Sequence, residues 1–101
     1  MEDLTIIMLT INNVPSAWAE FHKKTLLEAA GNYPIIVISK DKMDWGLPNV
    51  THIQQEVPED LWERTCNVYT QTLRGAELAK TPYVAVAEDD CLYPREHFIK
   101  F

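Results

Sequence analysis

The sequence is poor in glycine, cysteine and basic residues, and each shortage excludes a class of function. Its 3 glycines are too few for a P-loop or a dinucleotide-binding fingerprint. Its 2 cysteines, Cys66 and Cys91, are too few and too far apart for a zinc site or a disulfide framework, so we interpret them as free thiols in a reducing compartment. Lys and Arg number 9 against 15 Asp and Glu, and the net charge of −6 argues against nucleic acid as a partner.

Membrane and export signals are also lacking. No apolar run approaches the length of a membrane span, and the first residues, Met1-Glu2-Asp3, carry acids where a signal peptide carries Lys or Arg. Together with free thiols, these features predict a cytoplasmic protein with no membrane span.

What is present is an ordinary globular composition with alternating strand and helix patterns. Hydrophobic residues make up 47% of the 101 residues, a length that fits one domain. Continuous apolar runs rich in β-branched residues are typical of strands buried on both faces. We expect strands over 4–11, 35–39, 50–54 and 83–87, and helices over 16–31 and 61–80. This alternation predicts an α/β fold, an open parallel sheet with right-handed crossovers and helices on its faces.

The helical spacing also predicts which side chains face the core. In the first helix we expect the inward residues to be Trp18, Phe21, Thr25, Leu26 and Ala29, and the outward ones to be Glu20, Lys23, Lys24 and Glu28. Asn13 or Ser16 can cap the start of this helix and Gly31 its end. In the second helix the apolar line is Trp62, Tyr69, Leu73 and Ala76. His22 and His52 are expected at the surface, and Trp45 either pins its loop to the core or stacks on a ligand ring.

The acidic triplet Glu88-Asp89-Asp90 follows the last strand directly. Ligands of parallel sheets bind beyond the carboxyl ends of strands, so this triplet lies where a site is expected. Strand alternation predicts that Glu88 and Asp90 point to one side and Asp89 to the other. Two carboxylates on one side repel each other, and Mg²⁺ or Mn²⁺ would relieve that repulsion. A turn of solvated carboxylates fits the spacing equally well.

Two segments carry a resemblance to a known family. The stretch AELAKTPYVAVAEDDCLYPREHF resembles the segment leading into the DXD motif of GT-A-fold, family-2-like glycosyltransferases, and LTIIMLTINN resembles their first strand and donor-binding turn. The resemblance implies a Rossmann-like sheet of order 3-2-1-4, the N-terminal half of a GT-A fold. The chain departs from the family at Ser39-Lys40, where an Asp pair is usual, at Thr72-Leu73, where Arg-Asn is usual, and at Glu88, where the motif usually begins with Asp.

The resemblance also implies roles for particular residues. Asp90, assisted by Glu88, would bind Mn²⁺ or Mg²⁺. The donor-binding positions would be Thr10, Asn12, Ser39, Glu88 and Asp89. The implied function is transfer of a sugar from a nucleotide-diphosphate sugar to an acceptor that the sequence does not identify. The catalytic base is expected beyond Phe101, so residues 1–101 would form one nucleotide-sugar-binding domain, incomplete at its C-terminus. The alternative is a non-catalytic α/β binding module with an acidic loop.

An incomplete domain is also expected to expose an apolar flank. Uncovered sheet edges promote association, so we expect self-association. Trp18, Trp62 and Phe98 are the residues predicted for that surface.

Overall fold

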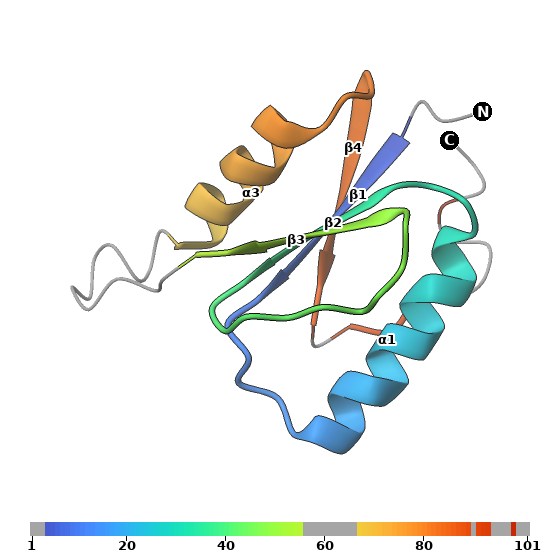
Figure 1. The fold of residues 1–101 in the computed structure, drawn as a ribbon, viewed down its shortest axis with the longest axis vertical. Helices are drawn as coiled ribbons and strands as arrows, with labels where there is room; N and C mark the ends of the chain where they lie inside the picture. Colours follow the sequence, from blue (N-terminus) through green and yellow to red (C-terminus); the bar gives the residue numbers. More distant parts are fainter. Residues whose placement is uncertain (1–3, 56–66, 90, 94–97, 99–101) are drawn as a thin grey trace.

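A computed structural model describes residues 4–55, 67–89, 91–93 and 98. The elements in these residues are β1 (Leu4–Thr10), α1 (Ser16–Ala30), β2 (Ile35–Ser39), β3 (Val50–Gln54), α3 (Asn67–Leu78) and β4 (Tyr83–Glu88) (Figure 1). The strands form one sheet in the order β3-β2-β1-β4, and every neighbouring pair is parallel. The predicted α/β fold and the strand order 3-2-1-4 are therefore confirmed, and the arrangement is Rossmann-like.

The two faces of the sheet are covered by different helices, which lie on opposite sides of it in Figure 1. On one face Leu26, Ala29 and Ala30 of α1 join a core cluster with alternate residues of β1 and β2. On the other face Ile7 and Leu9 of β1 and Ile36 and Ile38 of β2 cluster with Ala79, just past the end of α3. All the residues of β1 and β2 are buried, whereas β3 at the edge is partly exposed. The continuous apolar runs of β1 and β2 thus reflect burial on both faces.

Both ends of α1 are set by the backbone. Gly31 ends the helix as predicted, with a φ of 58° and an N–H that donates to the carbonyl of Leu27 at 3.2 Å. The predicted caps at the start, Asn13 and Ser16, are wrong. Pro15 holds the N-cap position with no side-chain cap, and its carbonyl accepts the N–H of Ala19 at 2.9 Å.

Several predicted side-chain orientations are also wrong. Phe21 is 51% exposed, because the buried face of α1 is centred on His22, Leu26 and Ala29. His22 is only 2% exposed, and a backbone carbonyl partner compensates its ring nitrogen for the loss of water. On α3 the predicted inward residues Leu73 and Ala76 are both exposed, Leu73 by 61%, because Gln71 and Gly75 take the inner face.

The structure exposes large apolar side chains, but they are not the residues predicted for the apolar flank. Phe98 is 1% exposed, and Trp18 is half-buried with its indole N–H donating to the carbonyl of Asp89 at 2.7 Å. Trp62 lies outside the described residues. Large apolar side chains are instead exposed on α3 and β4: Leu73, Leu78, Tyr83, Val84 and Val86. Within the described residues, no helix has the length and hydropathy needed to cross a membrane.

Candidate functional site

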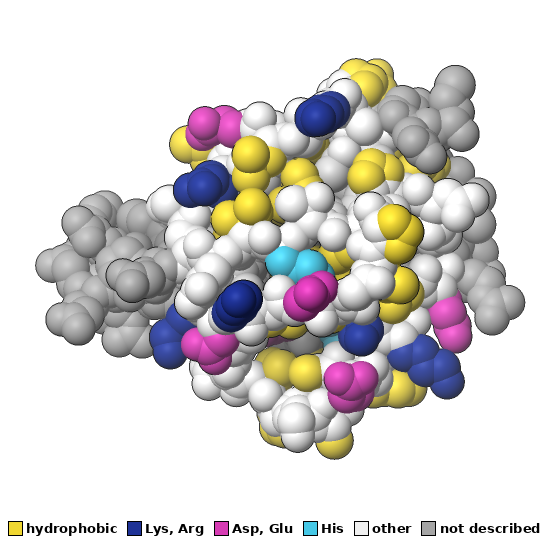
Figure 2. Space-filling model, viewed as in Figure 1, with side chains coloured by type: hydrophobic (Ala, Val, Ile, Leu, Met, Phe, Trp, Pro, Cys, Tyr) yellow, Lys and Arg dark blue, Asp and Glu magenta, His cyan; other side chains and the backbone are white. Residues whose placement is uncertain are grey.

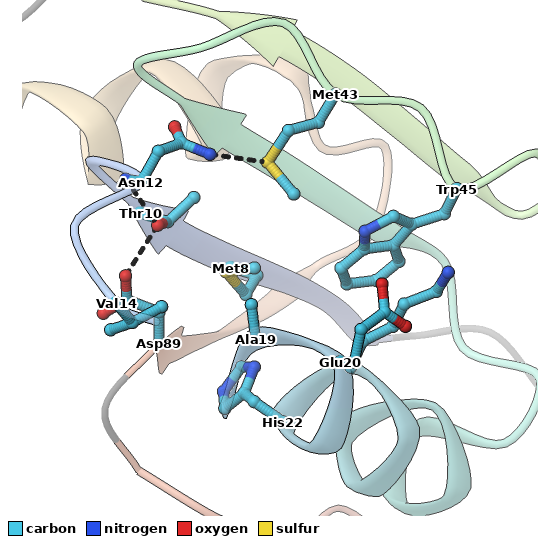
Figure 3. A pocket seen from close by; sticks show the side chains of 11 residues that line it. Met8, Thr10, Asn12, Val14, Ala19, Glu20, His22, Met43, Trp45 and Asp89 are labelled. Atoms are coloured by element: carbon cyan, nitrogen blue, oxygen red, sulfur yellow. Dashed lines mark hydrogen bonds between the residues drawn. The ribbon is translucent and has the colours of Figure 1, made fainter. Parts of the chain in front are cut away.

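A cavity of about 150 Å³ lies at the carboxyl end of β1, between α1 and the loop that follows β2 (Figure 3). Its apolar lining is Met8, Val14, Ala19, Met43 and Trp45. Its polar lining is Thr10, Asn12, Glu20, His22, Lys23 and Asp89. In Figure 2 this face of the molecule is hollowed between α1 and the loop, with apolar side chains in the hollow and charged side chains at its rim.

The cavity lies beside the point where the connections leaving the sheet diverge. From β1 the chain passes through α1 to β2, whereas β4, on the other side of β1, is reached through α3 on the opposite face. Such a switch point opens a crevice beyond the carboxyl ends of the two neighbouring strands, and ligands of α/β sheets bind there. The position of the cavity is therefore that of a binding site.

Thr10 and Asp89 meet across this switch point. The hydroxyl of Thr10, the last residue of β1, donates to Oδ2 of Asp89 at 2.6 Å. That distance is typical of a charge-assisted O–H···O⁻ bond. Asp89 is half-buried and shares the α1 side of the sheet with Ala87, two residues earlier in the chain. The middle acid of the triplet is thus the one that faces the cavity.

The other two acids are differently placed. The Glu88 side chain is exposed and does not line the cavity. Two side chains form hydrogen bonds with the backbone of Glu88. Its carbonyl accepts from Nε2 of His22 at 2.8 Å, and its N–H donates to the Tyr93 hydroxyl at 2.8 Å. Asp90 lies outside the described residues. Among those that are described, no three His, Cys, Asp or Glu side chains converge to hold a metal ion.

The turn after β1 is tied to the loop after β2 through Asn12. Asn12 has a positive φ of 59°, a conformation that asparagine tolerates better than most residues. Its N–H donates to Oγ1 of Thr10 at 2.9 Å, and its Oδ1 accepts the N–H of Asp41 at 2.8 Å. Its Nδ2 lies 3.2 Å from the sulfur of Met43. One asparagine thus fixes two loops that line the cavity.

Ser39 supports the same loop and does not face the cavity. Its buried hydroxyl donates to the carbonyl of Asp41 at 2.6 Å. The N–H of Lys40 donates to the carbonyl of Thr10 at 3.2 Å, which continues the pairing of β1 with β2 into the loop. Of the five predicted donor-binding residues, Thr10, Asn12 and Asp89 line the cavity, and Ser39 and Glu88 do not.

Two charged residues of the lining were expected on the outer face of α1. Glu20 and Lys23 both line the cavity, and Nζ of Lys23 lies 5.6 Å from the ring centroid of Trp45. A cation at that distance over an indole ring makes a favourable cation–π contact. The signal that could have placed Glu20 is its position early in the helix after β1, since that end of the helix lies at the carboxyl edge of the sheet.

Trp45 forms a wall of the cavity, and His52 contacts Trp45 through a hydrogen bond and ring packing. The backbone N–H of Trp45 donates to Nε2 of His52 at 2.9 Å. The indole and imidazole rings also pack edge to face, with centroids 5.6 Å apart. Burial lowers the pKa of His52 below its ordinary value. The carboxylate of Asp44 acts in the opposite direction and the ammonium of Lys23 in the same one. His52 is half-buried, so its predicted surface position is wrong, whereas the pinning role predicted for Trp45 is confirmed by its packing against the core.

Comparison with protein-family models, with curated proteins and with solved structures found no match to this chain.

The size of the cavity limits what it can hold. Pockets for complete small molecules usually measure about 300–1,000 Å³. At about 150 Å³ the cavity takes one ring of a ligand, and the remainder would lie along the open rim. Apolar walls with a hydroxyl, an amide and carboxylates between them suit a flat ring that carries polar groups on its edge.

Proposed function

We propose that this chain binds a nucleotide-diphosphate sugar at the carboxyl edge of its sheet, as the donor-binding half of a metal-dependent glycosyltransferase of the GT-A type. The observation that carries the proposal is the cavity beside the switch point of a 3-2-1-4 sheet, where Thr10 and Asp89 join the ends of β1 and β4. The resemblance of these two strand ends to the family's donor-binding turn and acidic motif supports the same function.

The lining suits the nucleoside part of such a donor. A base or ribose ring would pack between the apolar side chains Met8 and Met43 and the wall formed by Trp45. The carboxylates of Glu20 and Asp89 would accept hydrogen bonds from ring N–H or ribose O–H groups, since each carboxylate has about four acceptor positions. The acids of the lining would therefore recognise the donor groups of the ring.

The diphosphate would lie at the rim, beside the acidic triplet. The chain carries a net charge of −6, and carboxylates and phosphates repel each other without a cation. Glu88 and Asp90 supply the oxygen donors that Mn²⁺ or Mg²⁺ prefers, and such an ion can be held by one or two carboxylates together with phosphates. When bound, the ion would neutralise charge on the leaving diphosphate. The acceptor is of unidentified chemistry, and no base that would activate it is assigned among the described residues. A cytoplasmic location belongs to the same proposal.

A second candidate is a non-catalytic binding module with an acidic loop. It is favoured by the Thr10–Asp89 bond, which engages the cavity's own carboxylate. Such a module would bind a ring-containing ligand without a metal. The two candidates differ in whether a divalent cation changes the affinity.

Calorimetry with UDP and GDP, in Mn²⁺ and in EDTA, tests the proposal. We expect one diphosphate to bind, about tenfold or more tightly with Mn²⁺ than without it. Glu20→Gln should weaken binding because it removes a charged acceptor from the cavity. Glu77→Gln, an exposed change on α3, is the matched control and should have no effect. Binding that is equal in Mn²⁺ and EDTA would favour the non-catalytic module. No binding of either diphosphate would contradict the proposal.

A further inference from the structure

The Trp45 wall of the cavity depends on the protonation state of His52. A backbone N–H can only donate, so Nε2 of His52 must carry a lone pair to accept the Trp45 N–H at 2.9 Å. The proton of the neutral ring therefore sits on Nδ1. That atom is buried and makes no hydrogen bond to any described residue. The structure thus requires a neutral His52 in one defined tautomer.

Protonation of this ring is incompatible with the observed contact. A second proton on the ring would occupy Nε2 and point at the N–H of Trp45, so two donors would face each other. The charged groups around the ring are Asp44 in the loop and Lys23 on α1, while its partner on β2 is the apolar Val37. Asp44 does not offset the burial of the ring, since the pKa of His52 is lowered overall. The imidazolium form would therefore turn away from Trp45 or expose itself to water.

The second histidine at the cavity behaves in the opposite way. Nε2 of His22 lies 2.8 Å from the carbonyl oxygen of Glu88, and a carbonyl can only accept, so this nitrogen donates. This contact therefore does not require a lone pair on the ring nitrogen. His22 lines the cavity and His52 lies behind Trp45, and only the His52 contact needs a lone pair on the ring nitrogen.

We propose that His52 is an acid-sensitive latch, which holds Trp45 against the cavity while it is neutral and releases this wall when Nε2 is protonated. Release removes the surface on which a ligand ring would pack, so the cavity loses affinity in acid. The effect on ligand binding rests on the proposed function, whereas the latch itself is a property of the free protein.

NMR of the free protein tests the latch directly. Between about pH 7.5 and about pH 5, where histidines titrate, we expect the ¹⁵N shift of Nε2 to change from an acceptor to a protonated nitrogen. The indole resonances of Trp45 and the methyl resonance of Met43, a neighbour in the lining, should move with the same midpoint. In His52→Gln, whose amide oxygen can accept the Trp45 N–H at every pH, these movements should disappear.

Two results would overturn the latch. One is a proton on Nε2 of His52 at neutral pH. The other is a Trp45 indole and a Met43 methyl that do not respond while His52 titrates. The wild-type titration alone decides both points, so the result does not depend on the folding of His52→Gln.

Titration with uridine and guanosine, which lack ionisable phosphates, tests the effect on the cavity. If about a tenth of the molecules keep the wall in place at low pH, affinity falls about tenfold in the wild type and stays constant in His52→Gln. Equal affinity of the wild type at both pH values would overturn control of the cavity by the latch. Failure of both nucleosides to bind at either pH would contradict the proposed ligand, and the latch would still be decided by the free-protein titration.

Discussion

The hydroxyl of Thr10 donates a 2.6 Å hydrogen bond to the carboxylate of Asp89 across 79 positions of sequence. This bond joins the carboxyl ends of β1 and β4, which pair in parallel up to Leu9 and Glu88. The same hydroxyl oxygen accepts the N–H of Asn12, so one side chain orders both the acidic loop and the turn after β1. The geometry of the cavity therefore depends on Thr10 as well as on the acid that it contacts.

Thr10→Val should destabilise the protein, because valine has the same shape but can neither donate to Asp89 nor accept from Asn12. Leaving these two groups without their partner should cost about 1–3 kcal/mol in the free energy of unfolding. Urea denaturation measures the change. Thr51→Val, at an exposed position on β3, is the matched control and should change stability by about 0.5 kcal/mol or less. Equal effects of the two substitutions would mean that the Thr10 bond contributes nothing.

Gly75→Ala tests how closely α3 packs on the sheet. A Cβ at Gly75 would lie 2.5 Å from Cγ2 of Ile7 in the centre of β1, and no real contact is that short. Alanine improves helix propensity by about 1 kcal/mol, but overpacking of this kind costs about 1–3 kcal/mol, so we expect a net loss of stability. Ala76→Gly, at an exposed neighbour, measures the propensity difference alone. A Gly75→Ala variant that is more stable than the wild type would contradict the close packing.

The lowered pKa of His52 predicts that stability falls in acid. The unfolded chain protonates this ring around pH 6.5 and the folded chain only at lower pH, so the unfolded state binds more protons in between. The contribution of neutral His52 is therefore complete above the unfolded pKa and is lost as pH falls toward the folded one. Thermal unfolding between about pH 7.5 and about pH 5 measures it. His52→Gln should show a shallower decline than the wild type, and parallel curves would contradict the prediction.

The fold followed from sequence because its determinants are local. The runs that form β1 and β2 are mostly apolar and buried at every position, which is typical of a parallel strand covered on both faces. Gly31 ends α1 by its own backbone conformation. The strand order was an expectation of the resemblance, since local patterns do not specify which strands are neighbours.

The site was harder to predict, because its contacts join residues that are distant in the chain. Strand alternation put Asp89 on the side opposite Glu88, but only the position of α1 makes that the cavity side. His22 looked like a surface residue because its hydrogen-bond partner, the carbonyl of Glu88, lies 66 positions away. His52 contacts Trp45 only seven positions away, yet that contact depends on the path of a loop with no periodic pattern.

Within the acidic triplet we expect Asp89 to contact the ligand in the cavity and Asp90 to bind the metal ion. Substitution of each residue can separate these two roles. Asp89 faces the cavity and Thr10, so Asp89→Asn should weaken binding of a nucleoside diphosphate to a similar degree in Mn²⁺ and in EDTA. Asp90→Asn keeps the size of the side chain and removes a charged metal ligand, so it should abolish most of the gain that Mn²⁺ brings and leave binding in EDTA unchanged. Calorimetry on both variants, with the wild type as reference, measures the two effects. If the gain from Mn²⁺ survives Asp90→Asn, this carboxylate is not a metal ligand. If neither substitution changes binding, the triplet is a solvated turn.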